Sequence, residues 1–376
     1  MTAATPSSTD ILIVGAGIAG ASLAAALAPY RRVMMIEAED APGYHATGRS
    51  AAFWQESYGG VGVQPLTAAS FAALHDPDPG FSDRGFLAPR TALVVGRAAE
   101  AARIDAFVAA FDAQGVDVAR VGATALAAAI PGLRPEWSEA AFEPSCCDID
   151  VGRLHSAYLR AARRRGATLA TRTRFVAAQR RDGGWIAQTS QGDIDAAVIV
   201  NAAGAWADQV ATACGAAPVG IQPYRRTVAQ VRLDVATPAG LPLVAHVGGD
   251  FYFKGESEGR IWLSPHDETP SEPCDTAPDE VDVAIAIDRL QSVVDWPVAA
   301  VERKWAGLRS FAPDRLPVFG PDPAVRNFFW CAGQGGFGIQ TAPAIAGLTA
   351  AQLGAPVPGG AIGAIDPAVF APSRFV

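Results

Sequence analysis

A glycine-rich turn between a buried strand and a helix is the feature that most constrains how this chain can fold. Residues 10–14 form a largely apolar run typical of a buried parallel strand. The turn Gly15-Ala16-Gly17-Ile18-Ala19-Gly20 follows at once, and residues 21–28 have strong helical propensity. A second strand-like run, residues 32–36, ends at Glu37. This order of elements predicts a dinucleotide-binding α/β unit.

Each residue type in this unit has a physical role. Gly15 permits a tight turn, Gly17 lets the backbone approach a pyrophosphate, and Gly20 lets the helix pack closely on the strand. The helix N-terminus offers unpaired N–H groups to the phosphates, and Glu37 can accept hydrogen bonds from a ribose diol. The turn alone does not distinguish NAD from FAD. The following loop, residues 42–52, is rich in glycine and small polar residues, which favours contacts with a flavin.

Composition and charge exclude several other classes of protein. The chain has 376 residues, half of them hydrophobic, which predicts two or three domains with large cores. A net charge of −8 argues against nucleic acid or an anionic membrane as partner. The five cysteines contain no CxxC pair and the five histidines lie far apart, so we expect no metal site.

The apolar run from residue 11 to residue 28 is long enough to suggest a membrane span. It contains three glycines, however, and no Lys or Arg precedes it, so we interpret it as strand, turn and helix. We therefore expect a soluble cytoplasmic protein without a membrane span. The tail up to Thr9 is expected to be disordered.

Four further segments extend the pattern over nearly the whole chain. They are residues 43–52 (GYHATGRSAA), 198–206 (VIVNAAGAW), 305–317 (WAGLRSFAPDRLP) and 333–341 (GQGGFGIQT). Together with the N-terminal turn they resemble the D-amino-acid oxidase superfamily of flavoproteins, most closely its D-arginine dehydrogenase-like branch. The resemblance implies FAD as cofactor. No cysteine lies inside the flavin-contact motifs, and Cys331 is the nearest to them, so we predict that the FAD is bound non-covalently.

The resemblance also implies a fold. We expect an α/β protein with a Rossmann-type FAD-binding domain and an interleaved α+β substrate domain that carries a mainly antiparallel sheet. The FAD-binding domain would comprise residues 1–50, 145–220 and 305–376, and the substrate domain residues 51–144 and 221–304. Strand character at residues 168–175, 224–233, 251–254 and 260–263 agrees with this division.

The motifs supply the expected cofactor contacts, and the resemblance adds Val176 for the adenosine half. The full set is Gly15, Gly17, Ile18, Ala19, Gly20, Glu37, Ala38, His45, Thr47, Gly48, Arg49, Ser50, Ala51, Ala52, Val176, Ala203, Gly204, Trp206, Gly307, Arg309, Gly335, Gly336, Phe337, Gly338, Ile339 and Gln340. Residues 333–338 match GxGxxG a second time, but no strand or acid follows at the required distance. We interpret residues 335–340 as a helix N-terminus that faces the flavin pyrimidine.

The expected substrate contacts also come from the resemblance. Arg309 would bind a substrate carboxylate bidentately, with Tyr252, Tyr58 and a second arginine, Arg225, beside it. Because Arg226 is adjacent to Arg225, that last assignment is uncertain by one residue. The lining of the pocket would include Gly307 and Gly336.

Two positions depart from the arginine-preferring pattern. Phe53 stands where that branch carries a histidine, and Ala92 stands where it carries an acid. Together with Trp54 they predict an apolar wall, which would leave a cationic substrate side chain without a partner.

These features predict FAD-dependent oxidative deamination of a D-amino acid by a dehydrogenase or oxidase that favours neutral or apolar side chains. The sequence shows no obligatory acid or base, which fits hydride transfer from a neutral amine. Two alternatives stay open. One is a 2-hydroxy-acid or secondary-amine (glycine/sarcosine-type) oxidase, and the other is a flavin-binding subunit without turnover. The electron acceptor, whether oxygen, a quinone or another compound, also stays open.

Overall fold

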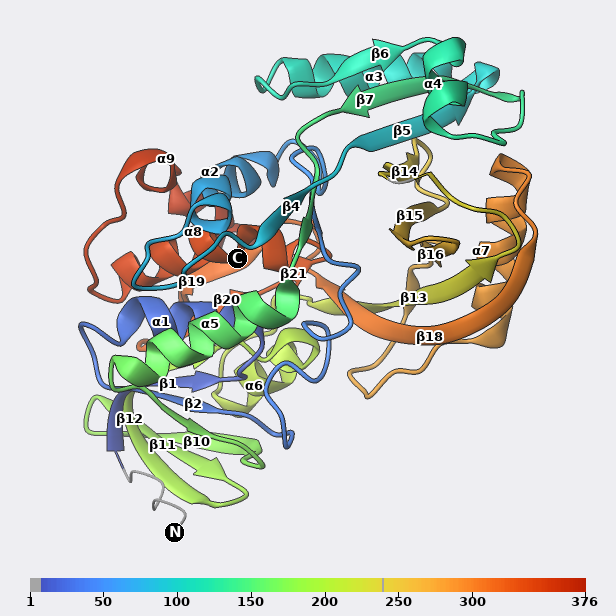
Figure 1. Cartoon of the computed structure of the whole chain (residues 1–376). Helices are drawn as coiled ribbons and strands as arrows, with labels where there is room; N and C mark the ends of the chain where they lie inside the picture. Colours follow the sequence, from blue (N-terminus) through green and yellow to red (C-terminus); the bar gives the residue numbers. More distant parts are fainter. Residues whose placement is uncertain (1–7, 239) are drawn as a thin grey trace.

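The computed structural model describes residues 8–238 and 240–376. These residues form two lobes that lie side by side (Figure 1). One lobe is built on the glycine-rich turn and its strands. The other holds a curved sheet with the long strands β13 (Gln222–Leu233) and β18 (Val298–Phe311) at its base. This arrangement confirms the expected fold class of a Rossmann-type domain with a second, mainly antiparallel sheet.

The nucleotide lobe is organised around an eight-stranded sheet whose centre is parallel. Strand β1 pairs in parallel with β12 on one side and β2 on the other, and β9 follows β2. The strands are β1 (Ser8–Val14), β2 (Val33–Ile36), β9 (Thr168–Ala170), β10 (Phe175–Arg181), β11 (Gly184–Thr189), β12 (Gly192–Asn201), β19 (Val318–Pro321) and β20 (Phe328–Ala332). Strand β2 and residues 11–14 of β1 are buried and consist entirely of apolar residues, as expected for strands covered on both faces.

Helices cover this sheet. The first, α1 (Ile18–Leu27), packs against α5 (Val151–Arg164) and α8 (Gly338–Gln352), and all three contribute to one apolar core. The other helices of this lobe are α2 (Gln64–His75), α6 (Ala207–Ala213) and α9 (Gly360–Gly363). Gly20 shows why α1 can lie so close to β1, because a Cβ at that position would overlap the carbonyl oxygen of Gly15. The packing role predicted for Gly20 is therefore confirmed.

The second lobe is a ten-stranded sheet with its own core. Its strands run in the order β21-β18-β13-β16-β15-β14-β5-β7-β6, with β17 paired to β13, and all pairs except β14 with β5 are antiparallel. The remaining strands are β5 (Ala92–Arg97), β6 (Ala119–Val121), β7 (Trp137–Glu143), β14 (Leu243–His246), β15 (Tyr252–Ser257), β16 (Arg260–Ser264), β17 (Thr269–Pro270) and β21 (Gln334–Gly335), and the helices are α3 (Ala101–Asp112), α4 (Ala123–Ala129) and α7 (Glu280–Val293).

A small three-stranded sheet lies at the junction of the lobes. It consists of β3 (Phe53–Trp54), β8 (Cys147–Ile149) and β4 (Leu87–Pro89). Strand β18 crosses the expected boundary at residue 305, because it pairs with β13 along its whole length and ends beside the nucleotide lobe. The three-segment division of the chain stays a proposal, with β18 as a shared element.

Three local predictions need correction. Ser8 and Thr9 belong to β1, and the Thr9 hydroxyl donates to the carbonyl of Arg32, so the expected disordered tail is wrong there, while residues 1–7 lie outside the described part. The strand expected over residues 168–175 is interrupted after Ala170, where the chain turns through Arg172 at φ 54°. Helix α8 begins at Gly338 rather than near Gly335, because Gly335 pairs with Ser310 as part of β21.

Candidate active site

A cavity of about 440 Å³ runs between the two lobes, from Glu37 at the end of β2 to Gly336 before α8. Most of the expected cofactor contacts line it. These are Gly15, Gly17, Ile18, Ala19, Glu37, Ala38, His45, Thr47, Arg49, Ser50, Ala51, Val176, Ala203, Gly204, Trp206, Gly307, Arg309, Gly335, Gly336, Gly338 and Ile339. Segments that lie far apart in the sequence therefore share one elongated space.

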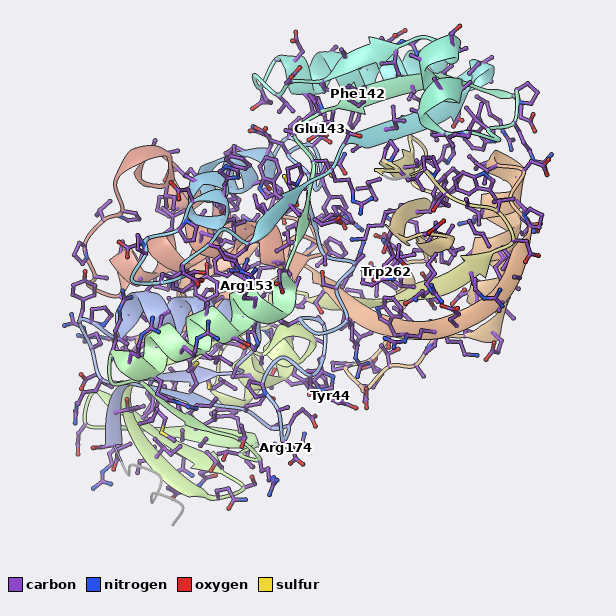
Figure 2. The ribbon with its side chains drawn as sticks, in the orientation of Figure 1. Tyr44, Phe142, Glu143, Arg153, Arg174 and Trp262 are labelled. Carbon is purple, nitrogen blue, oxygen red and sulfur yellow. The ribbon has the colours of Figure 1, made fainter. Side chains whose placement is uncertain are left out.

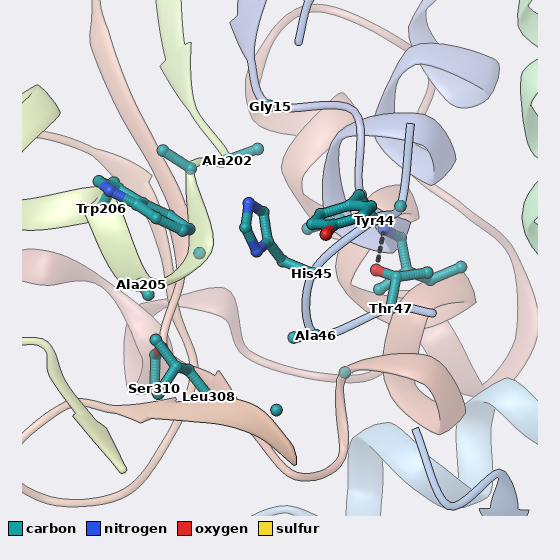
Figure 3. A pocket seen from close by; sticks show the side chains of 18 of the residues that line it. Gly15, Tyr44, His45, Ala46, Thr47, Ala202, Ala205, Trp206, Leu308 and Ser310 are labelled. Atoms are coloured by element: carbon teal, nitrogen blue, oxygen red, sulfur yellow. Dashed lines mark hydrogen bonds between the residues drawn. The ribbon is translucent and has the colours of Figure 1, made fainter. Parts of the chain in front are cut away.

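The glycine-rich turn has the shape that a dinucleotide needs. Gly15 has φ 103°, and a Cβ there would overlap the carbonyl oxygen of Ala202, so only glycine fits. The Thr47 hydroxyl accepts a hydrogen bond of 3.0 Å from the first helical N–H, that of Ile18, which ties the second motif to the start of α1 (Figure 3). The described residues thus fit a cofactor with a pyrophosphate.

The acid at the end of β2 is held ready for a diol. One carboxylate oxygen of Glu37 accepts from the N–H of Ala16 at 3.0 Å, and the other accepts from the N–H of Glu39 at 3.1 Å. These bonds fix the carboxylate at the cavity wall and leave lone pairs for ribose hydroxyls. His155 supports the same turn, because its ring Nε2 lies 2.9 Å from the carbonyl oxygen of Ala16.

Aromatic rings line the same end of the cavity. His45 lies between Trp206 and Tyr44, with ring centroids 4.7 and 5.1 Å away (Figure 3). Its Nε2 is 3.0 Å from a carboxylate oxygen of Glu39. This bond favours the hydrogen-bonding, structural role that the loop position of His45 suggests.

Five expected contacts do not line the cavity, and each has another position. Gly20 packs under the turn, and the N–H of Gly48 closes a turn on the carbonyl of Gly43. The carbonyl of Ala52 accepts from Lys254, Phe337 packs on Phe311, and Gln340 is buried against residues 55–67. These five residues therefore pack against or hydrogen-bond to neighbouring segments and do not face the cavity.

At the other end of the cavity, Arg309 is flanked by two tyrosines, Tyr58 and Tyr252, which stand behind the residues that line the cavity. Its Nη1 is 2.7 Å from the hydroxyl oxygen of Tyr58, and its guanidinium carbon lies 5.9 and 6.0 Å from the ring centroids of Tyr58 and Tyr252. The Tyr252 hydroxyl is buried and has no hydrogen-bond partner among the described residues. An unpaired hydroxyl beside a guanidinium is an arrangement that a ligand carboxylate can complete.

Comparison with known proteins gives the family. A sequence profile described as "FAD dependent oxidoreductase" matches residues 10–352. This chain belongs to that family. The match confirms the resemblance to the D-amino-acid oxidase superfamily and FAD as the cofactor.

Individual relatives point the same way. "FAD-dependent oxidoreductase domain-containing protein 1" of Bos taurus is 30% identical over 168 residues, which are 40% of this chain and 34% of the relative, so the match spans about a third of that protein. Glycine oxidase of Pseudomonas aeruginosa is 28% identical over 254 residues, 65% of each chain. The crystal structure of glycine oxidase from Geobacillus kaustophilus has a TM-score of 0.85 over 98% of this chain and 99% of that chain at 23% identity, a likeness of fold.

Within this FAD-dependent oxidoreductase, the structure corrects the assignment of the second arginine. Arg225 points away from the cavity and pairs with Asp282 at 2.7 Å. Arg226 lines the cavity, is 3% exposed, and donates to the carbonyl of Asp267 and to Glu268. Its Nη1 is buried without a partner among the described residues. Burial and the nearby Arg309 lower the pKa of Arg226 to about 10.

His266 lies beside this group and is held neutral. Burial, followed by the positive charges of Arg226 and Arg309, lowers its pKa to about 2. Its ring meets that of Tyr252 edge-on at 5.9 Å, and its Nδ1 contacts the carbonyl oxygen of Gly249. A neutral imidazole adds no charge to the arginine pair, and it is a poor proton acceptor at neutral pH.

None of the three residues expected to form the apolar wall lines the cavity, although Phe53 lies beside the two tyrosines near Arg309. Trp54 lies in the core of the nucleotide lobe, where its indole N–H donates to the carbonyl of Thr67, so its assignment to the pocket is wrong. Ala92 is buried in a cluster behind Tyr252 and does not line the cavity. Phe53 lies with its ring centroid 5.1 Å from that of Tyr58 and 6.0 Å from that of Tyr252.

One segment of the FAD cavity carries no motif that could have revealed it. Cys274 and Thr276, in the connection between β17 and α7, line the cavity. Asp275 between them accepts from the Tyr44 hydroxyl at 3.0 Å and from Arg49, whose Nη1 also donates to the carbonyl of Thr276 at 2.8 Å. We name residues 274–276 the strap. The strap places Cys274, rather than the buried Cys331, at the cofactor cavity.

The described residues hold neither a candidate metal centre nor a membrane-spanning helix. No group of three or more His, Cys, Asp and Glu side chains with a metal-binding arrangement occurs among them. None of their helices has the length and hydropathy required to cross a bilayer.

Proposed function

We propose that this protein oxidises the Cα–N bond of a small amino acid. Support comes from one observation above all, the position of Arg309 at the end of the FAD cavity, bonded to Tyr58 and about 6.0 Å from the ring of Tyr252, whose hydroxyl has no partner among the described residues. A substrate carboxylate would accept hydrogen bonds from Arg309, from Tyr252 and from the free Nη1 of Arg226. Substrate binding would thus satisfy the polar atoms that the protein leaves unpaired.

Bound FAD supplies a two-electron acceptor for the Cα hydride. The chain's own residues hold the carboxylate and thereby fix the position of Cα. Only two acids line the described cavity, Glu37 and Glu39, and both lie at the dinucleotide end. The amine must therefore arrive neutral, because no cavity carboxylate is placed to take its proton. Its lone pair forms the C=N bond as the hydride leaves, an N–H proton goes to solvent, and water hydrolyses the imine to the 2-oxo acid and ammonia.

The surroundings of Phe53 favour a neutral or apolar substrate side chain. Across β3 and β8, Phe53 pairs with Asp148, a half-buried acid that could in principle receive a basic side chain. Asp148 is already engaged by Lys254 at 2.7 Å and by the Arg90 Nε at 2.8 Å. Although burial alone would raise it, these two cations hold the pKa of Asp148 below its usual value. A guanidinium or ammonium from the substrate would thus lack a free partner.

The preference for the D enantiomer follows from the resemblance and belongs to the same proposal. A second candidate is a glycine- or sarcosine-type amine oxidase. Phe53 packs against both tyrosines that flank Arg309, with ring centroids 5.1 and 6.0 Å away, which favours a substrate with a small side chain. Glycine oxidase is also the name of one relative and of one structural neighbour.

Anaerobic mixing of the FAD-loaded protein with a substrate panel tests the proposal. The panel holds D- and L-leucine, D-phenylalanine, D-methionine, D-arginine, D-lysine, glycine, sarcosine and 2-hydroxyisocaproate. We expect the visible flavin band to bleach fastest with neutral D-amino acids. Fastest bleaching by glycine or sarcosine would select the second candidate, and fastest bleaching by the basic pair would contradict the neutral pocket. Reduction by the hydroxy acid alone, or by none, would overturn the proposed chemistry.

A further inference from the structure

The turn that carries Tyr58 is held by a carboxylate from the other lobe. Tyr58 follows β3 in the turn of residues 55–58, and Gly59 and Gly60 come next at φ 101° and 83°. Two glycines after the turn give it little stiffness of its own. The 2.7 Å bond between Tyr58 and Arg309 therefore depends on what holds residues 55–57 in place.

Glu143 provides that anchor. It is the last residue of β7, where the chain leaves the upper sheet and runs toward the nucleotide lobe (Figure 2), and it is 1% exposed. Its carboxylate accepts hydrogen bonds from the N–H groups of Glu56 and Ser57 at 2.8 and 3.3 Å, from the Gln55 amide at 3.0 Å, and from the Ser57 hydroxyl.

No Lys or Arg forms an ion pair with Glu143 in the described part of the chain. Its buried negative charge is therefore stabilised by hydrogen bonds from this turn. Movement of any one donor away from the carboxylate would cost free energy, because the buried charge would lose a hydrogen bond. The hydrogen bonds therefore hold the Glu143 carboxylate and residues 55–57 in one relative position.

The opposite side of the turn is held by α8. Gln340, which is 1% exposed, donates from its Nε2 to the carbonyls of Gln55 and Tyr58 at 3.3 and 3.2 Å and to the Thr67 hydroxyl at 2.8 Å. Its Oε1 accepts from the N–H of Gln55 at 3.2 Å. Gln340 fixes the backbone from the nucleotide lobe, while Glu143 fixes it from the substrate lobe.

We infer that Glu143 is a positioning residue for the carboxylate clamp, acting through Tyr58 on Arg309 without touching the substrate. This inference rests on the proposed function, because it takes Arg309 as the group that binds the substrate carboxylate. Gln in place of Glu143 keeps the shape of the side chain, but its amide nitrogen cannot accept from the donors of Ser57 and Gln55. The turn should then shift and release the Tyr58 hydroxyl.

The test measures binding of benzoate, a simple carboxylate, from its effect on the flavin spectrum, with benzamide as the uncharged comparison. Glu143→Gln should weaken benzoate binding about tenfold, the effect of losing one charge-assisted bond, and leave benzamide binding and FAD content unchanged. Glu139→Gln, on the same strand and paired with Arg120 instead, is the matched control and should bind benzoate normally.

A double-mutant cycle separates positioning from a general structural role. If Glu143 acts through Tyr58, then Glu143→Gln should have no further effect on benzoate binding in a Tyr58→Phe background. Additive losses, or a single variant that binds benzoate as the wild type does, would overturn the inference. If Glu143→Gln does not fold, Ser57→Ala, which removes one donor to the same carboxylate, replaces it in the cycle. Failure of wild-type protein to bind benzoate at all would instead refute the proposed role of Arg309, and this inference with it.

Discussion

Replacing Arg309 by methionine should remove the carboxylate clamp while leaving FAD bound. Methionine keeps much of the length of the side chain, so the cavity wall persists, but both the charge and the donors disappear. We expect kcat/KM for amino-acid substrates to fall by at least about a hundredfold. The variant should purify with the flavin content of the wild type.

The magnitude follows from the contacts of Arg309. A bidentate carboxylate loses two charge-assisted hydrogen bonds of about 1.5–3 kcal/mol each, which gives about 3–6 kcal/mol. At about 1.4 kcal/mol per tenfold, the expected loss is about 10² to 10⁴. Arg226 stays in place with its free Nη1, and because this remaining cation still attracts the carboxylate, we expect a value toward the lower end.

The assay is anaerobic flavin reduction over a range of substrate concentrations. Arg303→Met, at an exposed position of the same strand β18, is the matched control and should behave as the wild type. An amine without a carboxylate should be oxidised at the same low rate by wild type and variant. An Arg309→Met protein that holds FAD and oxidises amino acids with near wild-type efficiency would refute the reasoning.

Four further outcomes are expected. Gly15→Ala should purify without flavin, as measured by its absorbance ratio, because the new Cβ meets a backbone carbonyl at φ 103°. Asp275→Asn should release FAD several times faster on dilution, because the strap loses its ionic bond to Arg49; an unchanged rate would contradict this. Acid precipitation should free the flavin; flavin left on the pellet would show a covalent bond, for which Cys274 is the cysteine at the cavity. Finally, the pKa of His266 falls from 6.5 to about 2 on folding, so only the unfolded chain gains this proton as pH falls below 6.5. Its share of the unfolding free energy should drop by about 2 kcal/mol between about pH 7.5 and 5, and denaturant titrations of His266→Asn should lack that slope.

The parts of the fold that rest on local chemistry could be predicted from the sequence. The tight turn at Gly15 and the closely packed Gly20 need only a short stretch of chain, and the structure shows both steric constraints. The strand expected at residues 224–233 likewise appears within β13.

Assignments that depend on the face of a strand could not be fixed in this way. In β13, Tyr224 stands opposite Arg309 of β18, and Arg226 stands opposite Gly307. Arg226, Gly307 and Arg309 all line the cavity, whereas Arg225 points to the acids of the other side. Because side chains alternate, an uncertainty of one residue exchanges the two faces completely. Only the register in which β13 pairs with β18 determines which of the two arginines lines the cavity.

The same limit applies to the expected apolar wall, none of whose residues lines the cavity. Trp54 and Phe53 are neighbours in β3 and therefore point to opposite sides, one into the core of the nucleotide lobe and the other toward Tyr58. The position of the strap could not be predicted from the sequence for another reason. Its place over the cavity comes from the Asp275 bonds to Tyr44 and Arg49, which join positions more than two hundred residues apart.

The distribution of charge along the cavity links these local features to one chemistry. Glu37 and Glu39 lie at the dinucleotide end, whereas Arg226 and Arg309 lie at the other, with His266 held neutral beside them. Glu268 pairs with Arg226 but does not line the cavity, whereas an acid in the lining at this end would compete with the substrate carboxylate for a guanidinium. A protonated histidine there would add charge without adding directional donors for that carboxylate. The paired cations are tolerated because Glu268 accepts from Arg226 and the Tyr58 hydroxyl contacts Arg309. The site is thus arranged to bind an anion and to leave its amine free of any ionic partner, which is the state in which the amine can give up a hydride.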